Sequence, residues 1–495
     1  MYIIVTLGYL AILTAIIIKK SRSVQNEEDF VVAGRNVPVY LLVGTLITTW
    51  IGSGSLFGTA GLTFRTGFSE LWFSMGAWIG ILVVYFIAAR VRKISQYTLT
   101  DILEKRYAPI ARLLGTLTII IAYLIIAGYQ FKGGGRFISI LTEGAISPEI
   151  GTLISCIVII AFTALAGMVS IVNIDIFNGA IMIIAIILAV PFALNAHGGW
   201  DQVVSTISAV SPDHLSMTEG HSTGWYIGIL LPTLLLLLSE SSVYQKFSSA
   251  KDAKSAKQAV FGMFVGVVVI EFLMCFLAVV GFAIYADDPR FFLADGAINE
   301  AMSEEIILRI GFEQLPALVG SLLFAGGVAI IISTGNTFLM VTSTNVSRDL
   351  IEKYFYKTDD TRKKLFIQRI AVLILGILAY LAVTQFTTIL SMALISYTMI
   401  GASLAPALLA TFFWKRVTKE GGIASIASGM LTVVIITVLN NVYESSSLDL
   451  GIMSFPFDTD FIAIPAIIVS LSTLIVVSLL TKPTDPEIVE KFFEK

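Results

Sequence analysis

The sequence predicts an all-α membrane protein that crosses the bilayer about thirteen times. The chain has 495 residues, of which 56% are hydrophobic and only 14% are charged, and its mean hydropathy is +0.87. A soluble domain carries about 25% charged residues, so this chain lacks the polar side chains to cover a water-exposed surface of its size. We therefore expect neither a soluble enzyme, nor a nucleic-acid-binding protein, nor a secreted disulfide scaffold.

Apolar stretches that are long enough to cross a bilayer recur along nearly the whole chain. A bilayer core of about 30 Å takes about 20 apolar residues per helix. The predicted spans are 2–18, 39–62, 68–90, 114–142, 150–168, 172–196, 224–245, 258–286, 306–347, 366–386, 389–414, 420–441 and 460–481. The stretch 306–347 is too long for one straight span, so we expect it to include a lead-in on the outer side.

The distribution of basic residues predicts the orientation. The first apolar run, residues 1–18, has no basic residue before it and is followed by three between residues 19 and 22. This pattern favours a retained helix with an outer N-terminus over a cleaved signal peptide. Thirteen spans then place 27 of the 32 Lys and Arg residues on the cytoplasmic side, together with the C-terminus. The short loops favour a bacterial inner membrane.

Two of the predicted spans contain residues that interrupt a helix. The second span carries Gly52 and Gly54 among hydroxyl residues, and the seventh carries the polar run 239–242 directly after five leucines. Counted from the second span, these are the first helices of two consecutive five-span halves. Paired interrupted helices predict an inverted-repeat transporter with its binding site near the middle of the membrane. Ordinary helix packing is the alternative role for these small residues.

This repeat divides the chain into five parts. We expect an extra N-terminal helix with its loop (1–38), a first repeat (39–196), a second repeat (197–416), two extra C-terminal helices (417–481) and a cytoplasmic tail (482–495).

Seven short sequence blocks occur in a fixed order between residues 30 and 350. They are 30–38 (FVVAGRNVP), 52–58 (GSGSLFG), 98–107 (TLTDILEKRY), 175–179 (DIFNG), 244–246 (YQK), 333–337 (STGNT) and 347–349 (SRD). As an ordered set they resemble the sodium/solute symporter family. The resemblance implies a LeuT-like core of two five-helix inverted repeats, with one extra helix before the core and two after it.

The same resemblance implies a core Na⁺ site between the first and eighth core helices. Carried over by position, its ligands are the backbone carbonyls of Thr48, Ile51 and Ile330 and the hydroxyls of Ser333 and Thr334. Na⁺ is a hard cation that prefers oxygen ligands, and carbonyls become available where a helix is broken. The alternative for the two hydroxyls is hydrogen bonding to the preceding turn of their own helix.

Some family members use a second Na⁺ site, whose matching positions here are Asp175, Ser333, Asn336 and Thr337. A carboxylate inside an apolar stretch is a candidate functional residue by default. The chain departs from the family pattern at Ile174, where a threonine is common, and at Asn336, where some members have a hydroxyl. A salt bridge at the cytoplasmic end or a helix cap is the alternative role for Asp175.

The family binds its solute near the middle of the membrane, so polar and aromatic residues near the breaks are the candidate contacts. These candidates are Trp50, Gly52, Ser53, Ser55, Gln130, Lys132 and Glu240. Trp50 matches a tryptophan in the cationic cage of choline-transporting relatives, and helix packing is its alternative role. We expect Arg136 near the outer end of the pocket.

Glu240 is the most informative of these residues, because a charge at that depth costs several kcal/mol unless it is paired or neutralised. The Glu240 carboxylate is expected either to contact a cationic group of the substrate or to bind a proton. The alternative is a structural ion pair with Lys132. A facing carboxylate and ammonium suit a zwitterion or a polar amide, whereas Glu240 with Trp50 alone suits an ammonium.

We therefore expect a Na⁺-coupled symporter that imports a small polar organic solute by alternating access, with an amino acid, an amine or a similar zwitterionic or cationic solute favoured. Its expected partners are Na⁺, the solute and the lipid bilayer, with no nucleic acid and no obligatory protein partner. A proton-coupled symporter of the same fold and a transporter-like solute sensor are the alternatives. We expect no enzyme, and we expect His197, His214 and His221 in the outer segment to be solvated side chains rather than metal ligands.

Overall fold

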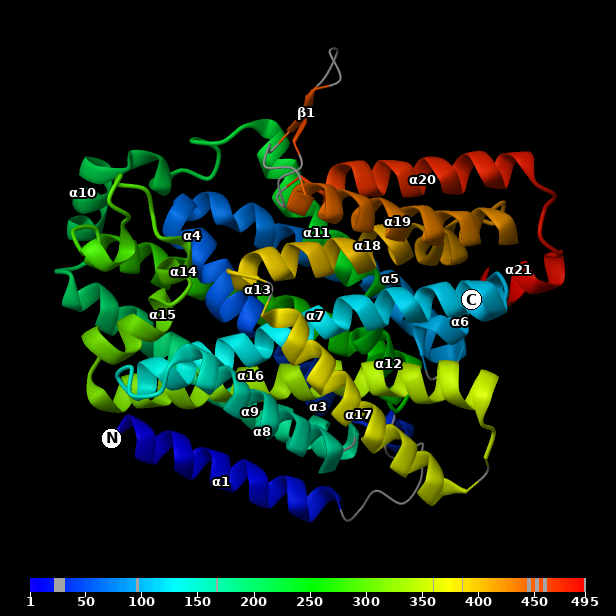
Figure 1. Cartoon of the computed structure of the whole chain (residues 1–495), viewed down its shortest axis with the longest axis horizontal. Helices are drawn as coiled ribbons and strands as arrows, with labels where there is room; N and C mark the ends of the chain where they lie inside the picture. The colour runs from blue at the N-terminus through cyan, green and yellow to red at the C-terminus, as the bar shows by residue number, and fades with distance from the viewer. Residues whose placement is uncertain are drawn as a thin grey trace.

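Long apolar helices, most of them aligned with one another, make up most of the structure (Figure 1). The computed structural model describes residues 1–21, 32–94, 98–165, 168–358, 360–384, 386–442, 447–449, 454–456 and 461–493. The first two residues of the predicted block 30–38 and most of the outer segment 442–459 lie outside this part of the chain. In Figure 1, α1 (Tyr2–Ser21) begins at the left end of the bundle and α21 (Pro486–Phe493) lies at the right end.

The described part of the chain contains twelve helices long and apolar enough to cross a membrane. One of them, Gly54–Ile94, comprises η2 (Gly54–Thr59), α4 (Ala60–Thr66) and η3 (Gly67–Glu70), and then α5 (Leu71–Ile94). The predicted second span, 39–62, is α3 (Val39–Trp50) together with the first part of this helix. Thirteen crossings therefore result when α3 and the segment up to Thr66 are counted as one interrupted span.

The remaining long helices agree with the predicted spans to within a few residues at most ends. They are α7 (Pro109–Leu141), α8 (Pro148–Leu165), α9 (Met168–Ala196), α11 (Thr223–Ser239) with α12 (Ser241–Ser249), α13 (Ala253–Ile284), α16 (Ala317–Thr344) with η7 (Asn345–Phe355), α17 (Thr361–Val383), α18 (Ile389–Phe413), α19 (Lys419–Val442) and α20 (Ala463–Leu480). Several begin with a side-chain cap. Asp252, for example, accepts a hydrogen bond from the backbone N–H of Ser255 at the start of α13.

The helices differ in how much of their surface other helices cover. Nearly all of α18 and most of α16 are buried, whereas α1, α19 and α20 expose apolar side chains such as Leu7 and Leu480. Large exposed apolar side chains over such a surface are expected where lipid, rather than water, surrounds the protein. The chain is therefore a multi-pass membrane protein with its most buried helices in the middle of the bundle.

Short elements gather at the two ends of the bundle. The end on the left of Figure 1 carries α10 (Trp200–Val210), α14 (Glu300–Ser303) and α15 (Ile306–Arg309). The short elements η4 (Pro212–Leu215), η5 (Pro289–Phe291) and η6 (Ile310–Gln314) adjoin these three helices. The predicted lead-in before the eighth core helix is confirmed, because α16 begins only at Ala317. The other end carries η1 (Ala33–Arg35) and α6 (Leu99–Arg106), and the antiparallel pair β1 (Ser447–Asp449) and β2 (Ser454–Pro456) projects from the side.

Candidate ion and solute site

Two helices are interrupted near the middle of the bundle, at the positions predicted from the sequence. α3 ends at Trp50, and Ile51 has an extended backbone (φ −77°, ψ 108°) before the helix resumes. α11 ends at Ser239, and Glu240 is likewise extended (φ −67°, ψ 103°) before α12 begins. Such interruptions leave backbone carbonyls and N–H groups without their helical partners, which makes them available to a bound ion or solute.

The hydroxyl of Thr334 on α16 lies at the break in α3. Its Oγ1 donates to the carbonyl oxygen of Thr48 at 3.0 Å and to that of Ile51 at 3.2 Å. Three of the five predicted ligands of the core Na⁺ site therefore converge on one point. Ile330 is buried one helical turn before Thr334 on α16, and its carbonyl stays a predicted ligand.

The fifth predicted ligand, Ser333, points to a different partner. Its hydroxyl donates to Asp175 Oδ1 on α9 at 2.5 Å, and the hydroxyl of Thr45 donates to the other carboxylate oxygen. Asp175 and Ser333 belong to the predicted second Na⁺ site. Its other two members, Asn336 and Thr337, form no hydrogen bond with them in the described chain. Asn336 Oδ1 accepts from Thr163 on α8 at 2.9 Å, and Thr337 Oγ1 is buried with no partner among the described residues.

Gln130 on α7 also binds the break in α3. Its side-chain oxygen accepts the backbone N–H of Ser53 at 2.9 Å, while its Nε2 and the hydroxyl of Ser53 are buried without a partner among the described residues. A Cβ on Gly52 would lie 2.9 Å from Thr334 Cγ2 and 3.0 Å from Gln130 Nε2. Glycine is therefore what lets α3, α7 and α16 approach here. Ser55 is buried one turn further on.

Aromatic side chains form a wall beside the same break. The ring centroid of Tyr397 on α18 lies 6.3 Å from that of Trp50 and 6.4 Å from that of Phe73. The hydroxyls of Tyr397 and Tyr129 lie 3.1 Å apart. A Cβ on Gly54 would lie 2.8 Å from the Tyr397 hydroxyl, so the absence of a side chain at Gly54 leaves room for this hydroxyl. Phe73, Tyr129 and Tyr397 were not predicted from the sequence.

Glu271 on α13 is a further buried carboxylate that the sequence analysis missed. Its two oxygens accept from Trp50 Nε1 at 2.7 Å and from Trp78 Nε1 at 2.6 Å. The carboxylate therefore fixes the Trp50 ring at the end of α3. A signal was available, because Glu271 stands inside an uninterrupted apolar stretch, and an intramembrane carboxylate is a candidate functional residue.

Glu240 occupies the break between α11 and α12 and is 1% exposed. Its Oε1 accepts from the Ser242 hydroxyl at 3.0 Å, from the Ser242 backbone N–H at 3.3 Å and from Tyr123. Its Oε2 has no partner among the described residues. The carboxylate is thus an N-terminal cap for α12 with one oxygen left over.

The structural pairing of Glu240 with Lys132 is wrong. The Lys132 ammonium donates to the carbonyl of Phe386 and lines a separate cavity of about 250 Å³ with Arg136, Glu149 and other residues of α7, α8 and α17. Tyr123, not Lys132, lies on the face of α7 that meets Glu240. A helix turns 100° per residue, so positions 123 and 132, nine residues apart, lie on opposite faces of α7.

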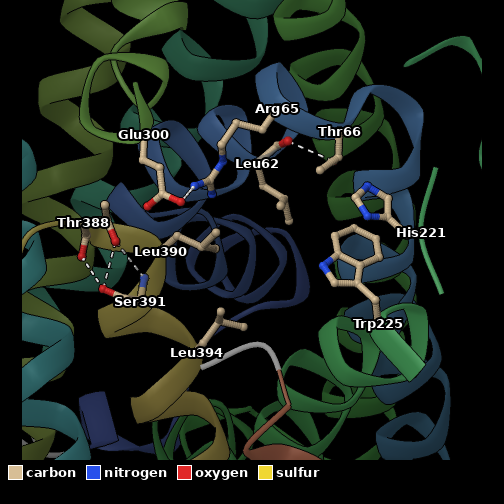
Figure 2. Close-up of a pocket in the computed structure, with 10 residues that line it drawn as sticks. All are labelled: Leu62, Arg65, Thr66, His221, Trp225, Glu300, Thr388, Leu390, Ser391 and Leu394. Atoms are coloured by element: carbon tan, nitrogen blue, oxygen red, sulfur yellow. Dashed lines mark hydrogen bonds and ion pairs between the residues drawn. The ribbon is translucent and has the colours of Figure 1, made fainter. Parts of the chain in front are cut away.

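A hollow of about 370 Å³ lies at the end of the bundle that carries α14 (Figure 2). Leu62 and Arg65 of α4, Glu300 of α14 and Leu394 of α18 line it, among others. Arg65 and Glu300 form an ion pair at one side of it, with 2.9 Å between Nη1 and Oε1. This hollow lies on the side that the charge distribution predicts to be the outside.

The histidines near this hollow differ from the expectation of solvated side chains. His221 stacks on Trp225 with ring centroids 3.8 Å apart, and burial lowers its pKa, so the ring is neutral at pH 7. His214 is buried, stacks on Phe282 and is hydrogen-bonded to the Phe64 carbonyl. Within the part of the chain that the structure describes, no group of His, Cys, Asp or Glu residues is arranged to hold a metal ion.

A buried ion pair lies near the same end. Arg136, which was predicted near the outer end of the pocket, pairs with Glu304. The Glu304 carboxylate also accepts the backbone N–H groups of Ile389 and Leu390 at 3.0 and 2.8 Å, and so caps α18. One carboxylate therefore joins α7 to the start of α18.

The opposite end is held by a cluster of ion pairs around Arg112, at the start of α7. Its guanidinium contacts Asp101 and Glu104 of α6, at 3.1 and 2.7 Å, and Asp349 of η7. Lys353 adds a further contact to Glu104. These ion pairs hold α6, the start of α7 and η7 together at this end of the bundle.

Two interrupted helices inside a bundle of long apolar helices define a class of fold, the LeuT-like fold of membrane transporters. Solved structures support the fold assignment. The described chain superposes on the substrate-bound outward-open state of a Na⁺-coupled sialic acid symporter with a TM-score of 0.76, covering 98% of each chain at 15% identity. MhsT in complex with L-phenylalanine gives a TM-score of 0.52, covering 89% of this chain and 97% of that one at 13% identity.

The chain belongs to the sodium:solute symporter family, whose model matches residues 30–429. Among its relatives, the high-affinity proline transporter PutP of Bacillus subtilis (strain 168) is 26% identical, covering 94% of this chain and 95% of the relative. A sodium/proline symporter of Staphylococcus aureus is 25% identical, covering 96% and 91%. The family is one of transporters and not of enzymes, and it implies coupling of a small solute to sodium.

Proposed function

We propose that this protein imports a small zwitterionic amino acid across a bacterial inner membrane, with its N-terminus outside and its C-terminus in the cytoplasm, and that Na⁺ drives the import. The observation that carries the proposal is the convergence of Thr334 Oγ1 with the carbonyls of Thr48 and Ile51. A Na⁺ ion needs oxygen ligands, and here one hydroxyl oxygen and two carbonyl oxygens from two helices face each other. The ion binds there with Ile330 and Ser333 as its remaining candidate ligands.

The chemistry of the surrounding residues supports an amino acid as the solute. Glu240 has one carboxylate oxygen left over, which suits an ammonium group through a charge-assisted hydrogen bond. Gln130 Nε2 and the Ser53 hydroxyl are donors without a partner among the described residues, which suit a carboxylate. The rings of Trp50 and Tyr397 offer an apolar wall. Proline, which appears in the names of the relatives, has an ammonium group, a carboxylate and an apolar ring to match these three parts of the site.

Coupling follows from where the ion sits. Na⁺ ties α3 to α16 and fixes the break at Ile51, which presents Ser53 and Trp50 to the solute. The hollow at Arg65 is the proposed entry for ion and solute, and the ion pairs around Arg112 hold the opposite end of the bundle together. Ion and solute together then favour closure of the outer side, and escape of Na⁺ into the cytoplasm frees the solute. The two sites are coupled because each ligand prefers the conformation that the other also prefers.

The test is uptake of radiolabelled L-proline, with other amino acids, amines, carboxylates and sugars as competitors, into proteoliposomes. An inward Na⁺ gradient is expected to drive accumulation, and an equal K⁺ gradient is not. Accumulation driven by a pH gradient in Na⁺-free buffer would replace the proposal with proton coupling. Binding without any net uptake would favour a solute sensor.

A further inference from the structure

A buried lysine lies beside Asp175, the carboxylate of the predicted second Na⁺ site. Lys246 follows the break in α11–α12, and its side chain is 0% exposed. Its ammonium donates to the carbonyl oxygen of Thr45 at 2.8 Å and lies 3.9 Å from Asp175 Oδ2. The lysine therefore joins α12 to α3 and α9 at the point where a second Na⁺ would bind.

The environment of Asp175 is complete without a metal ion. Its Oδ1 accepts from Ser333, and its Oδ2 accepts from Thr45 and faces the Lys246 ammonium. A buried ammonium is costly unless a carboxylate balances it, and Asp175 is 1% exposed and equally in need of a cation. Each of the two charges thus accounts for the burial of the other.

The other residues of that site do not gather around Asp175. Asn336 Oδ1 is taken by Thr163 on α8, and Thr337 has no hydrogen bond to Asp175 in the described chain. A Na⁺ ion bound to Asp175 would lie within a few ångströms of the Lys246 ammonium, and like charges at that distance repel in a buried site. With the Lys246 ammonium in place, the surroundings of Asp175 therefore do not fit a second Na⁺.

We propose that Lys246 is the built-in counter-cation of Asp175, so that the chain couples one Na⁺, rather than two, to each solute molecule. This inference rests on the proposed Na⁺-coupled function. The Lys246 ammonium occupies the place of a second transported ion, and in this way it sets the ratio of Na⁺ to solute. The core Na⁺ at Thr334 remains the only driving ion.

The Na⁺-to-solute ratio is measurable at equilibrium in proteoliposomes clamped at zero voltage, with L-proline as the probe. A tenfold Na⁺ gradient sustains about a tenfold gradient of a zwitterion if one Na⁺ is coupled, and about a hundredfold gradient if two are. The wild type is expected to give about tenfold. A hundredfold gradient in the wild type would overturn the inference while leaving Na⁺ coupling intact, whereas no Na⁺-driven gradient would overturn the proposed function itself.

Three variants test the role of the lysine. Lys246→Gln leaves the Asp175 carboxylate open to Na⁺ and is expected to raise the sustained gradient toward a hundredfold. Lys246→Arg keeps a cation there and is expected to stay near tenfold. Lys254→Gln removes an exposed lysine at the start of α13 and serves as the control. A folded Lys246→Gln variant that still sustains only a tenfold gradient would show that this lysine does not set the stoichiometry. The wild-type ratio decides the Na⁺ count even where a variant fails to fold.

Discussion

The Thr334 hydroxyl on α16 lies 3.0 Å from the backbone carbonyl oxygen of Thr48 on α3, across the point where α3 is interrupted. A threonine in a membrane helix ordinarily donates to the preceding turn of its own helix. Thr342, two turns further along α16, does this by bonding the Phe338 carbonyl at 2.7 Å. Thr334 instead donates to carbonyl oxygens of the neighbouring segment, and these same oxygens are the ligands expected for a bound Na⁺.

Replacing Thr334 by valine is expected to weaken the response to Na⁺. The substitution removes one ligand oxygen while keeping the shape of the side chain. Loss of a ligand to a charged group costs about 1.5–3 kcal/mol, so the Na⁺ concentration for half-maximal uptake should rise by at least about tenfold. Thr342→Val is the matched control, because its hydroxyl serves only its own helix. Equal shifts in the two variants would place the ion elsewhere.

Glu240→Gln is expected to lower the affinity for solutes that carry an ammonium group. The amide cannot supply the charge that the unpartnered carboxylate oxygen offers, so the affinity for L-proline should fall by roughly 10- to 100-fold. Tetrahydrofuran-2-carboxylate, in which oxygen replaces the proline nitrogen, should compete equally well with either protein. A purely structural role as the cap of α12 would instead lower the melting temperature without changing this selectivity.

Trp50→Phe and Trp78→Phe each remove one indole donor from Glu271. Both are expected to cost about 1–3 kcal/mol of stability, because each leaves one oxygen of a buried carboxylate unpaired. Only Trp50 lies at the break in α3, so only Trp50→Phe should raise the KM for solute. The measurement is solute uptake alongside thermal unfolding. Equal KM changes would indicate that Glu271 acts on the fold and not on the pocket.

The two ion pairs near the hollow are expected to differ strongly in their contribution to stability. Arg136→Gln leaves Glu304, which is 1% exposed, without its cation, and breaking a buried pair costs about 3–5 kcal/mol. Arg65→Gln breaks a pair whose partner Glu300 is 62% exposed, and should cost about 0–1 kcal/mol. Thermal unfolding of the two variants makes the comparison. A similar loss in both would mean that the Arg136 pair is not buried in the native protein.

Local sequence was sufficient to predict the crossings and both breaks. Gly52 and Gly54 tolerate the close approach of neighbouring helices, and Glu240 with its flanking serines ends one helix and caps the next. The spans followed from apolar length alone, which the bilayer sets. The stretch 39–62 was predicted as one span with a break, and the structure divides it at Ile51 into α3 and the helix that begins near Gly54.

Partners on distant helices were not predictable in the same way. Nothing near Lys246 in the sequence indicates that it reaches Thr45 and Asp175, and the pairing of Lys132 with Glu240 failed because it depends on which face of α7 each residue occupies. Tyr397 of α18 meets Trp50 of α3 and Phe73 of α5 only in the folded structure, because the three residues are far apart in the sequence. Glu271 was missed although its place in an apolar stretch could have indicated it.

The most direct test of the central claim is the melting temperature of the purified protein in Na⁺ and in equimolar K⁺. A ligand present at 100 times its Kd stabilises the native state by about 2.7 kcal/mol. Na⁺ is expected to raise the melting temperature of the wild type and of Thr342→Val, but not of Thr334→Val. Identical curves in Na⁺ and K⁺ for the wild type would contradict a Na⁺ site between α3 and α16.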